Sequence, residues 1–245
     1  SIFSAFICLL ISLNLPAQSH SLFKDDFVDN KNKWLAKSDE KRAAKVEGGR
    51  YIMAHKREKG TWFFWNRAPY MSFAKDFVIE TKLKLSSGTN DHSFGLTWGV
   101  ENSKNMHVFV LSGNGFFRIF RYDEGNYIVE QAWKKHSAIK KAGQFNKLRL
   151  ERKGNLLYYY INDSLVYTKA YLKMFGNGVG FILQNEMTVD ADYLYVYQDH
   201  KINLVPDANE DRKVQSLGTN INTEASEIMP VISPDGNSLY FVRKN

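Results

Sequence analysis

The feature that most constrains the fold of this chain is a series of short segments in which inward and outward positions alternate. In FVIETKLKL, residues 77–85, every second residue starting from Phe77 forms one mainly apolar face, and Glu80 and Lys82 lie on the other. Side chains of a β-strand point to opposite sides at successive residues, so this pattern predicts a strand with one buried and one solvated face.

Similar segments follow at regular intervals, with turn-forming residues between them. The predicted strands cover residues 93–100, 106–112, 116–122 and 127–133, three strands within 145–170, and then VGFILQN and DADYLYVYQ. The spacing indicates about ten to twelve strands, and a three-turn helix is compatible only with KSDEKRAAK, residues 37–45. We therefore expect an all-β fold, an antiparallel two-sheet β-sandwich of jelly-roll type, with a closed barrel as the alternative.

Composition agrees with a folded, strand-rich chain. Aromatic residues make up 14% and charged residues 24%, and the 245 residues include only five prolines. The 33 basic and 26 acidic residues give a net charge of +7, and basic clusters occur in KSDEKRAAK, AHKREK and WKKHSAIKKA. Acidic residues interrupt these clusters and no nucleic-acid-binding motif accompanies them, so we interpret them as solvated loops and expect no nucleic-acid partner.

The first 19 residues predict export from the cytoplasm. They carry no charge and are almost wholly apolar from Ile2 to Leu15, a length typical of the apolar region of a signal peptide. We expect residues 1–19 to be a signal peptide cleaved near Ala17, with a buried N-terminal element as the alternative, and no transmembrane segment elsewhere. Cys8, the only cysteine, lies within this run, so the mature chain has no disulfide or cysteine metal ligand.

The order of the segments from residue 20 to 198 resembles the concanavalin A-like lectin/glucanase superfamily, in particular its laminin-G-like and three-keto-disaccharide-hydrolase-like secreted modules. The resemblance rests on DDFVDNKNKW, EGGRYIM, DFVIETKLKLSSG, SFGLTWGV, GFFRIFRY, FNKLRLERKGNLLYYYINDSLVY, GNGVGFILQN and VDADYLYVY. It implies a jelly-roll sandwich in which Asn162 and Asp163 form a structural hairpin turn. Asn and Asp tolerate the positive φ of such turns.

A second resemblance lies near the C-terminal end. Residues 199–226 are polar and carry Pro206, which predicts a linker. The segment that follows resembles a repeat of WD40-like, TolB-type β-propellers through Pro230, the turn residues Ser233, Pro234, Asp235 and Gly236, and then Leu239, Tyr240 and Phe241. A blade takes roughly 40 to 45 residues, so we expect residues 227–245 to be a truncated first blade. The resemblance implies a periplasmic, outer-membrane-associated or extracellular protein.

Catalytic residues of a glycosidase are sparse in this sequence. A glucanase of this fold needs two carboxylates on one face of a strand. Only Asp190 and Asp192 have the required spacing, and no third acid follows them. We interpret them as weak candidates and expect a protein that is not an enzyme.

Metal ligands are equally sparse. The six histidines are scattered, and none has the spacing of a zinc site. The resemblance leaves a structural calcium ion open, with Asn90 and Asp91 as weak candidate ligands. No other cofactor is expected.

Aromatic side chains are the better candidates for binding a ligand. Aromatic faces stack on sugar rings and expose a large apolar area at small entropic cost. Each aromatic residue has core packing as its alternative, and residues three apart on a strand point to opposite faces, so at most one of Trp62 and Trp65 would meet a ligand. The candidates are Trp62, Trp65, Trp98, Tyr122 and Trp133, with Arg118 and Gln184 as polar partners.

These observations predict an exported, non-catalytic binding module for carbohydrate, attached to a β-propeller in a longer cell-envelope protein. A glycoside hydrolase acting on a saccharide is one alternative. A structural domain that binds an envelope protein partner is the other.

Overall fold

The structure is a computed structural model, and it describes residues 20–198, 216–219, 221, 223, 226–233 and 237–244. The predicted signal peptide, most of the predicted linker and the turn residues Pro234, Asp235 and Gly236 lie outside the described residues. Every regular element within them is a β-strand, so they include no helix of membrane-spanning length. The two units of the chain, which divide after His200, are considered separately.

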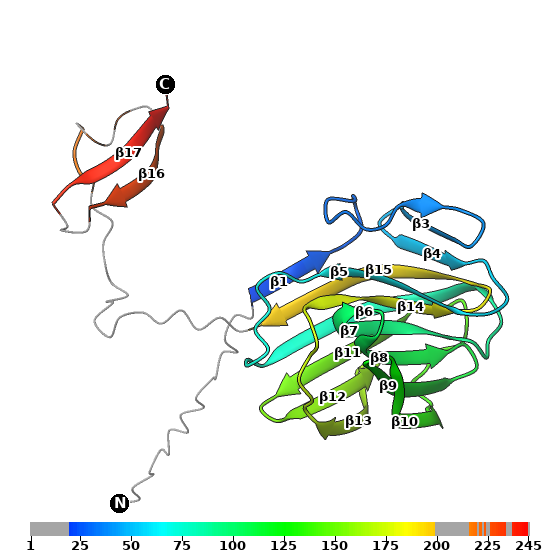
Figure 1. The fold of residues 1–245 in the computed structure, drawn as a ribbon. Helices are drawn as coiled ribbons and strands as arrows, with labels where there is room; N and C mark the ends of the chain where they lie inside the picture. Colours follow the sequence, from blue (N-terminus) through cyan, green and yellow to red (C-terminus); the bar gives the residue numbers. More distant parts are fainter. Residues whose placement is uncertain are drawn as a thin grey trace, which may run out of the picture. The chain divides into compact units, whose positions relative to one another are not determined.

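The larger unit is a sandwich of two antiparallel sheets (Figure 1), which confirms the predicted fold class. The nine-stranded sheet has the order β13-β12-β11-β6-β15-β4-β3-β2, and β1 also pairs with β15. Its strands are β1 (His20–Asp25), β2 (Lys37–Ser38), β3 (Arg42–Val46), β4 (Tyr51–His55), β6 (Phe77–Gly88), β11 (Asn146–Lys153), β12 (Leu156–Ile161), β13 (Ser164–Ala170) and β15 (Met187–Gln198).

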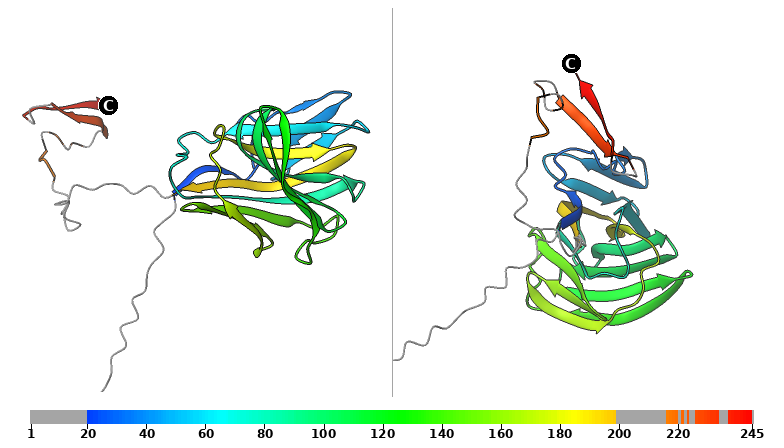
Figure 2. Two further views of the ribbon diagram at one scale, coloured as in Figure 1. Left: turned by 60° about the horizontal axis from the view of Figure 1, so that its bottom comes forward. Right: turned by 90° about the vertical axis from the view of Figure 1, so that its left-hand side faces the viewer.

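The second sheet has six strands in the order β10-β9-β8-β7-β14-β5. Its strands are β5 (Thr61–Arg67), β7 (Ser93–Asn102), β8 (Asn105–Ser112), β9 (Phe116–Asp123), β10 (Asn126–Lys135) and β14 (Gly178–Gln184). Figure 2 shows how strongly these strands twist and curve. The hairpin between β12 and β13 turns through Asn162 and Asp163, whose φ angles are 48° and 67°, as their turn chemistry predicts.

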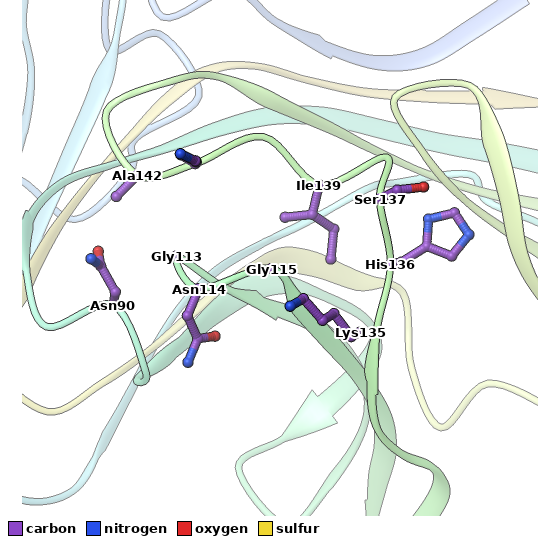
Figure 3. Close-up of a pocket in the computed structure, with 10 residues that line it drawn as sticks. Asn90, Gly113, Asn114, Gly115, Lys135, His136, Ser137, Ile139 and Ala142 are labelled. Carbon is purple, nitrogen blue, oxygen red and sulfur yellow. The ribbon is translucent and has the colours of Figure 1, made fainter.

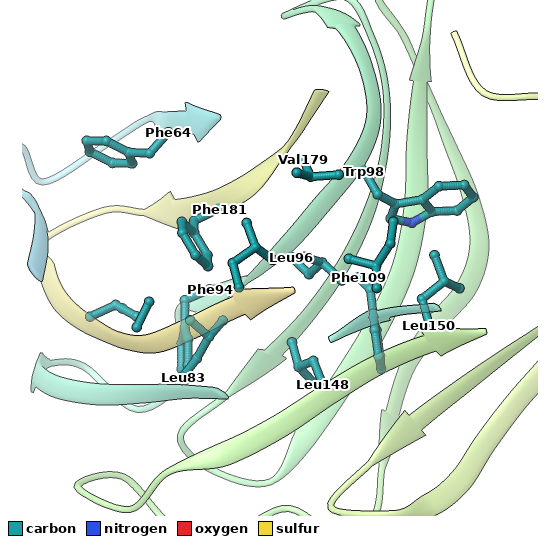
Figure 4. Packing of buried hydrophobic residues seen from close by; sticks show 14 of the residues in the cluster. Phe64, Leu83, Phe94, Leu96, Trp98, Phe109, Leu148, Leu150, Val179 and Phe181 are labelled. Atoms are coloured by element: carbon teal, nitrogen blue, oxygen red, sulfur yellow. The ribbon is translucent and has the colours of Figure 1, made fainter. Parts of the chain in front are cut away.

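The main core lies between the sheets and is built from the inward-facing residue of each alternating pair. Figure 4 shows Phe94, Leu96 and Trp98 of β7 beside Leu148 and Leu150 of β11, and all five are almost completely buried. Complete burial of such a side chain contributes about 1.5–3 kcal/mol. The first and last strands of this unit, β1 and β15, pair with each other and complete the sheet.

The segment KSDEKRAAK forms two strands, β2 and β3, instead of the helix that its composition allows. The carboxylate of Asp39 accepts hydrogen bonds from the backbone N–H groups of Lys41 and Arg42, at 2.9 and 3.0 Å. This local capping reverses the chain, and β3 then pairs with β4. The sheet therefore overrides the weak helical preference.

A buried carboxylate organises the first loop. Asp25, which is 1% exposed, accepts hydrogen bonds from the backbone N–H of Phe27 at 2.8 Å and from the indole N–H of Trp34 at 2.7 Å. Its second oxygen also accepts a 2.7 Å bond from the side-chain amide of Asn32. These bonds hold Trp34 against Tyr51, with ring centroids 5.1 Å apart, at the centre of the core.

The smaller unit contains a two-stranded sheet of β16 (Ser226–Ile232) and β17 (Leu239–Lys244). The backbone N–H of Ser233 donates to the carbonyl of Ser238 at 2.8 Å, which closes the hairpin around the predicted turn. Hairpins of this kind occur in many folds. The propeller assignment therefore stays a prediction.

Replacing Asp25 tests the role of this carboxylate. We expect Asp25→Ala to lower the free energy of unfolding by roughly 2–4 kcal/mol, because it leaves buried donors of Phe27 and Trp34 without an acceptor. Chemical denaturation monitored by tryptophan fluorescence measures the change. Asp29→Ala removes an exposed carboxylate that bonds only the backbone N–H of Lys31, so it should cost much less. Equal losses for the two variants would contradict this account.

Candidate functional site

The outward face of the six-stranded sheet carries most of the predicted ligand-binding residues. Register partners of neighbouring antiparallel strands lie on the same face. From one edge to the other, the residues on this face are Phe63 and Trp65 of β5; Gly180, Ile182 and Gln184 of β14; Ser93, Gly95 and Thr97 of β7; Val108, Val110 and Ser112 of β8; Arg118, Phe120 and Tyr122 of β9; and Tyr127, Val129 and Trp133 of β10.

This face is curled so strongly that β5, at one edge, meets β9, the strand next to the other edge. The rings of Phe63 on β5 and Tyr122 on β9 are 6.1 Å apart, although three strands separate β5 from β9. In a flat sheet these strands would lie roughly 19 Å apart. The two rings pack against a second buried cluster formed by Val100, Met106, Val108, Val110, Phe120 and Ile182.

Glycines in the central strands allow this curvature. A Cβ atom at Gly180 would lie 2.1 Å from the carbonyl oxygen of Phe64, and one at Gly95 would lie 2.2 Å from that of Phe109. A side chain at either position would therefore force the neighbouring strand away. Glycine is needed where two backbones approach this closely.

One end of the face is polar. The hydroxyl of Ser93 donates to the side-chain carbonyl of Gln184, and the hydroxyl of Ser112 donates to that of Asn114 at 2.6 Å. Gln184, a predicted polar partner, thus lies at the end of the sheet where the buried apolar cluster gives way to hydrogen-bonding groups.

Arg118 forms the centre of an exposed aromatic group on the same face. Its guanidinium carbon lies 5.0 Å from the ring centroid of Tyr127 and 5.8 Å from that of Trp133. Trp133 is 40% exposed and Tyr127 is 44% exposed. We call Arg118, Tyr127 and Trp133 the arginine platform; two rings flanking a planar cation offer stacking surfaces and hydrogen-bond donors together.

A pocket of about 870 Å³ lies where β8, β9 and β10 end in their connecting loops (Figure 3). Three loops line it, and they contribute Asn90, Gly113, Asn114, Gly115, Lys135, His136, Ser137, Ile139, Lys141 and Ala142. Lys135 pairs in register with Phe116 and lies two residues from Trp133, a separation of roughly 7 Å along the strand. The platform and the pocket are thus linked through β10, and we call the two together the candidate site.

Two asparagines fix the loop at residues 136–142 that lines this pocket. The side chain of Asn146 accepts from the backbone N–H of Lys140 at 2.8 Å and donates to its carbonyl at 3.1 Å. Asn162 donates to the carbonyl of Ala138 at 2.7 Å and to Asn146 at 2.8 Å. Asn162, expected only to form a turn, therefore also positions the candidate site.

Trp62 and Trp65 point to opposite faces of β5. Trp65 is 38% exposed on the outward face, at the edge opposite the arginine platform. Trp62 faces the other way, packs against the main core, and is covered by the guanidinium of Arg42, 4.3 Å from its ring centroid. Trp62 is therefore removed from the ligand-binding set.

Trp98 is also removed from the set. Its side chain has no exposed surface and stacks on His107, with ring centroids 4.2 Å apart. Trp98 is buried, and not exposed as a ligand-binding residue would be, because it lies on the inward face of a central strand. Burial lowers the pKa of His107 to about 4, so this ring is neutral at pH 7.

Tyr122 has a structural task that its sequence context does not reveal. It closes the curled face against Phe63 and is only partly exposed. Tyr127, its register partner on β10, is the more accessible ring and was not among the predicted residues. Burial raises the pKa of Tyr127, and the charge of Arg118 offsets part of that rise.

Asp190 and Asp192 lie on the nine-stranded sheet, away from the candidate site, and both are in ion pairs. Asp190 is 2.9 Å from the ammonium group of Lys84 and 3.6 Å from Arg50, and Asp192 is 3.3 Å from Lys82. Between Ala191 and Tyr193 the strand register shifts, which breaks the simple alternation that the spacing assumes. Both carboxylates are therefore engaged by basic side chains, and a catalytic role for them stays a prediction.

Asn90 and Asp91, the weak calcium candidates, are not joined by further ligands. Asp91 is exposed, with His92 3.9 Å away, and Asn90 lines the pocket. The described part of the chain contains no group of three or more His, Cys, Asp or Glu residues placed to hold a metal ion. A calcium site here stays a prediction.

The outward face of the nine-stranded sheet also carries aromatic residues. Tyr193 and Tyr195 are stacked with ring centroids 4.4 Å apart. The hydroxyl of Tyr193 donates to Glu80 and that of Tyr195 to Asp26, so their polar groups are already bonded within the protein. The arginine platform is the better candidate for this reason.

Comparisons with known proteins identify the fold. No protein-family model matches the sequence, and no curated protein matches it. Among solved structures, a protein of unknown function with a galectin-like fold from Bacillus subtilis is 10% identical, with a TM-score of 0.54, over 73% of this chain and 96% of that one. The Bacillus licheniformis β-glucanase is 9% identical, with a TM-score of 0.53, over 74% of this chain and 98% of that one.

A third structure extends the comparison. The catalytic domain of an endo-1,3-β-glucanase (laminarinase) from Thermotoga petrophila is 13% identical, with a TM-score of 0.52, over 76% of this chain and 100% of that one. At these identities the likeness concerns the fold alone. Residues 20–198 therefore share the jelly-roll sandwich fold of these structures.

Replacing Asn146 tests how the pocket loop is held. We expect Asn146→Ala to speed hydrogen exchange at the amide of Lys140 by at least about tenfold, because that amide loses its acceptor. Mass spectrometry of exchanged fragments measures the effect. Asn155→Ala changes an exposed turn residue on the neighbouring hairpin and should leave this amide unchanged. Unchanged protection in Asn146→Ala would show that the loop is held by other contacts.

The buried His107 predicts how stability depends on pH. Its folded-state pKa of about 4 lies below its ordinary value of 6.5, so the unfolded chain binds a proton first. The stabilising contribution is present above pH 6.5 and is lost as pH falls from 6.5 to 4, at up to about 1.4 kcal/mol per pH unit. We expect urea denaturation of His107→Phe, which keeps a stacked ring, to show a smaller loss over this interval. An equal loss in both proteins would contradict the assignment.

Proposed function

We propose that residues 20–198 are a non-catalytic carbohydrate-binding module, and that the candidate site receives the sugar. The observation that carries the proposal is the arginine platform, in which two exposed rings of β10 flank a cation, and the same strand ends at an 870 Å³ pocket. Sugar-binding sites combine apolar faces for the rings with a few hydrogen-bonding groups for the hydroxyls. The glucanases among the similar structures support carbohydrate as the ligand class.

The distribution of carboxylates supports binding without hydrolysis. A retaining glycosidase needs two carboxyl groups about 5 Å apart, and an inverting one about 6.5–9.5 Å apart, on either side of the scissile bond. The described residues that line the pocket and form the platform include no Asp or Glu. Glu130 of β10 faces the interior and is paired with Arg121 and Lys169.

We also propose that the module belongs to a longer exported protein of the cell envelope, in which a β-propeller follows the linker. The apolar N-terminal segment supports export. The hairpin of β16 and β17 exposes large apolar side chains, including Met229, Ile232 and Tyr240, that a further packed strand or blade would cover. An isolated hairpin is marginally stable, so a propeller would supply the missing contacts.

Removing the platform rings tests the proposed function. We expect Trp133→Ala and Tyr127→Ala each to weaken binding of an oligosaccharide by about 5- to 150-fold, because stacking on an aromatic ring contributes roughly 1–3 kcal/mol. A glycan array identifies the ligand, and calorimetry then measures the affinity. Tyr70→Ala removes a ring that is 85% exposed in another loop and should have no effect.

Three outcomes would contradict the proposal. Loss of binding in Tyr70→Ala as well would mean that no specific face is involved. Release of reducing sugar, abolished by Asp190→Asn or Asp192→Asn, would identify a glycoside hydrolase. Absence of any glycan binding, together with capture of an envelope protein, would favour the protein-interaction alternative.

A further inference from the structure

We infer that the saccharide bound at the candidate site is acidic, with a uronate carboxylate held by Arg118 and Lys135. This inference rests on the proposed function and specifies the class of sugar. The fold leaves the positive charge of this site without a compensating negative charge.

Arg118 is a cation without an anionic partner. Its side chain makes no ion pair and no hydrogen bond among the described residues, and its Nε atom is buried without an acceptor. The residue is only partly buried, so an incoming acceptor can reach a charged group that the fold leaves without an anionic partner. The aromatic rings beside it offer only partial compensation.

Arg121, three residues along the same strand, shows the contrast. It faces the interior and binds Glu130 at 2.9 Å and Asp123 at 3.5 Å. The fold thus supplies two carboxylates to the inward arginine and none to the outward one. Glu130 also lies 2.6 Å from Lys169, so its charge is neutralised by two cations on the inward side.

The pocket adds positive charge. Lys135 and Lys141 line it, and no ion pair involves either among the described residues. His136, which also lines the pocket, accepts a hydrogen bond from the backbone N–H of Ala138 and packs on Phe117. These lysines belong to the basic cluster WKKHSAIKKA, which we interpret as a solvated loop when only the sequence is considered.

The geometry suits a carboxylate on a sugar ring. A guanidinium presents parallel N–H donors that match the two oxygens of a carboxylate, and hydrogen bonds of this charged type are about twice as strong as neutral ones. Trp133 and Tyr127 flank the cation, so a pyranose stacked on either ring would place a substituent within its reach. Lys135, two residues from Trp133 on β10, would contact the carboxylate of a neighbouring acidic sugar unit in the saccharide.

The test compares acidic oligosaccharides with their uncharged methyl esters. Calorimetry on the purified full chain, in calcium-free buffer of low salt, measures binding of hexagalacturonate, oligomannuronate and oligoglucuronate, each in both forms, alongside neutral laminarin and cellulose oligomers. We expect one acidic oligomer to bind at least tenfold more tightly than its methyl ester, with affinity that falls as salt rises.

Variants of Arg118 identify the group responsible. Arg118→Gln should reduce the preference for the acid over its ester to less than threefold. Arg118→Lys should retain part of this preference, because lysine keeps the positive charge but lacks the two parallel N–H donors of the guanidinium. Lys104→Gln removes one positive charge from the exposed turn between β7 and β8, at the end of these strands away from the pocket, and should keep the full preference.

The outcomes separate this inference from the proposed function. Binding of neutral and acidic oligomers with equal affinity would overturn the inference and leave the proposed function intact. Binding of none of the saccharides would overturn both. A preference for the acid that survives in Arg118→Gln, or is lost in Lys104→Gln, would show that general charge and not Arg118 carries it.

Discussion

The contact between Phe63 and Tyr122 is the constraint on which the rest of the site depends. It joins strands that are separated by three others, so it exists only because the six-stranded sheet is rolled around its own apolar cluster. This sandwich therefore has two buried layers, one between the sheets and one inside the curl. The outward face is closed over its centre, and polar and aromatic groups remain accessible at one end and one edge, where the arginine platform and the pocket lie.

The alternation of the sequence predicts the strands and the class of fold because a half-buried strand repeats its environment every two residues. It predicts β6 and the Asn162–Asp163 turn well for this reason. It fails where side chains meet across strands far apart in sequence. The alternating pattern alone does not distinguish Trp98, which is buried on His107, from Trp133, which is exposed.

The same limit explains the residues that sequence reasoning missed. Tyr127 lies in a segment of edge-strand character, and only its pairing with Tyr122 places it beside Arg118. The tasks of Asn146 and Asn162 depend on a hydrogen bond between two turns 16 residues apart. Spacing alone also brings Asp190 and Asp192 together as a catalytic pair, and it does not reveal the register shift or the three basic neighbours that engage them.

The central claim is that the arginine platform, on the outward face of the six-stranded sheet, meets the ligand. Nuclear magnetic resonance tests it directly, because the chain has only five tryptophans and their indole N–H signals are readily followed during a titration with a saccharide that binds. The account predicts that the Trp133 indole signal shifts most, while those of the buried Trp34 and Trp98 stay in place. Shifts confined to the tyrosines of β15, on the outward face of the other sheet, with no change at Trp133, would contradict it.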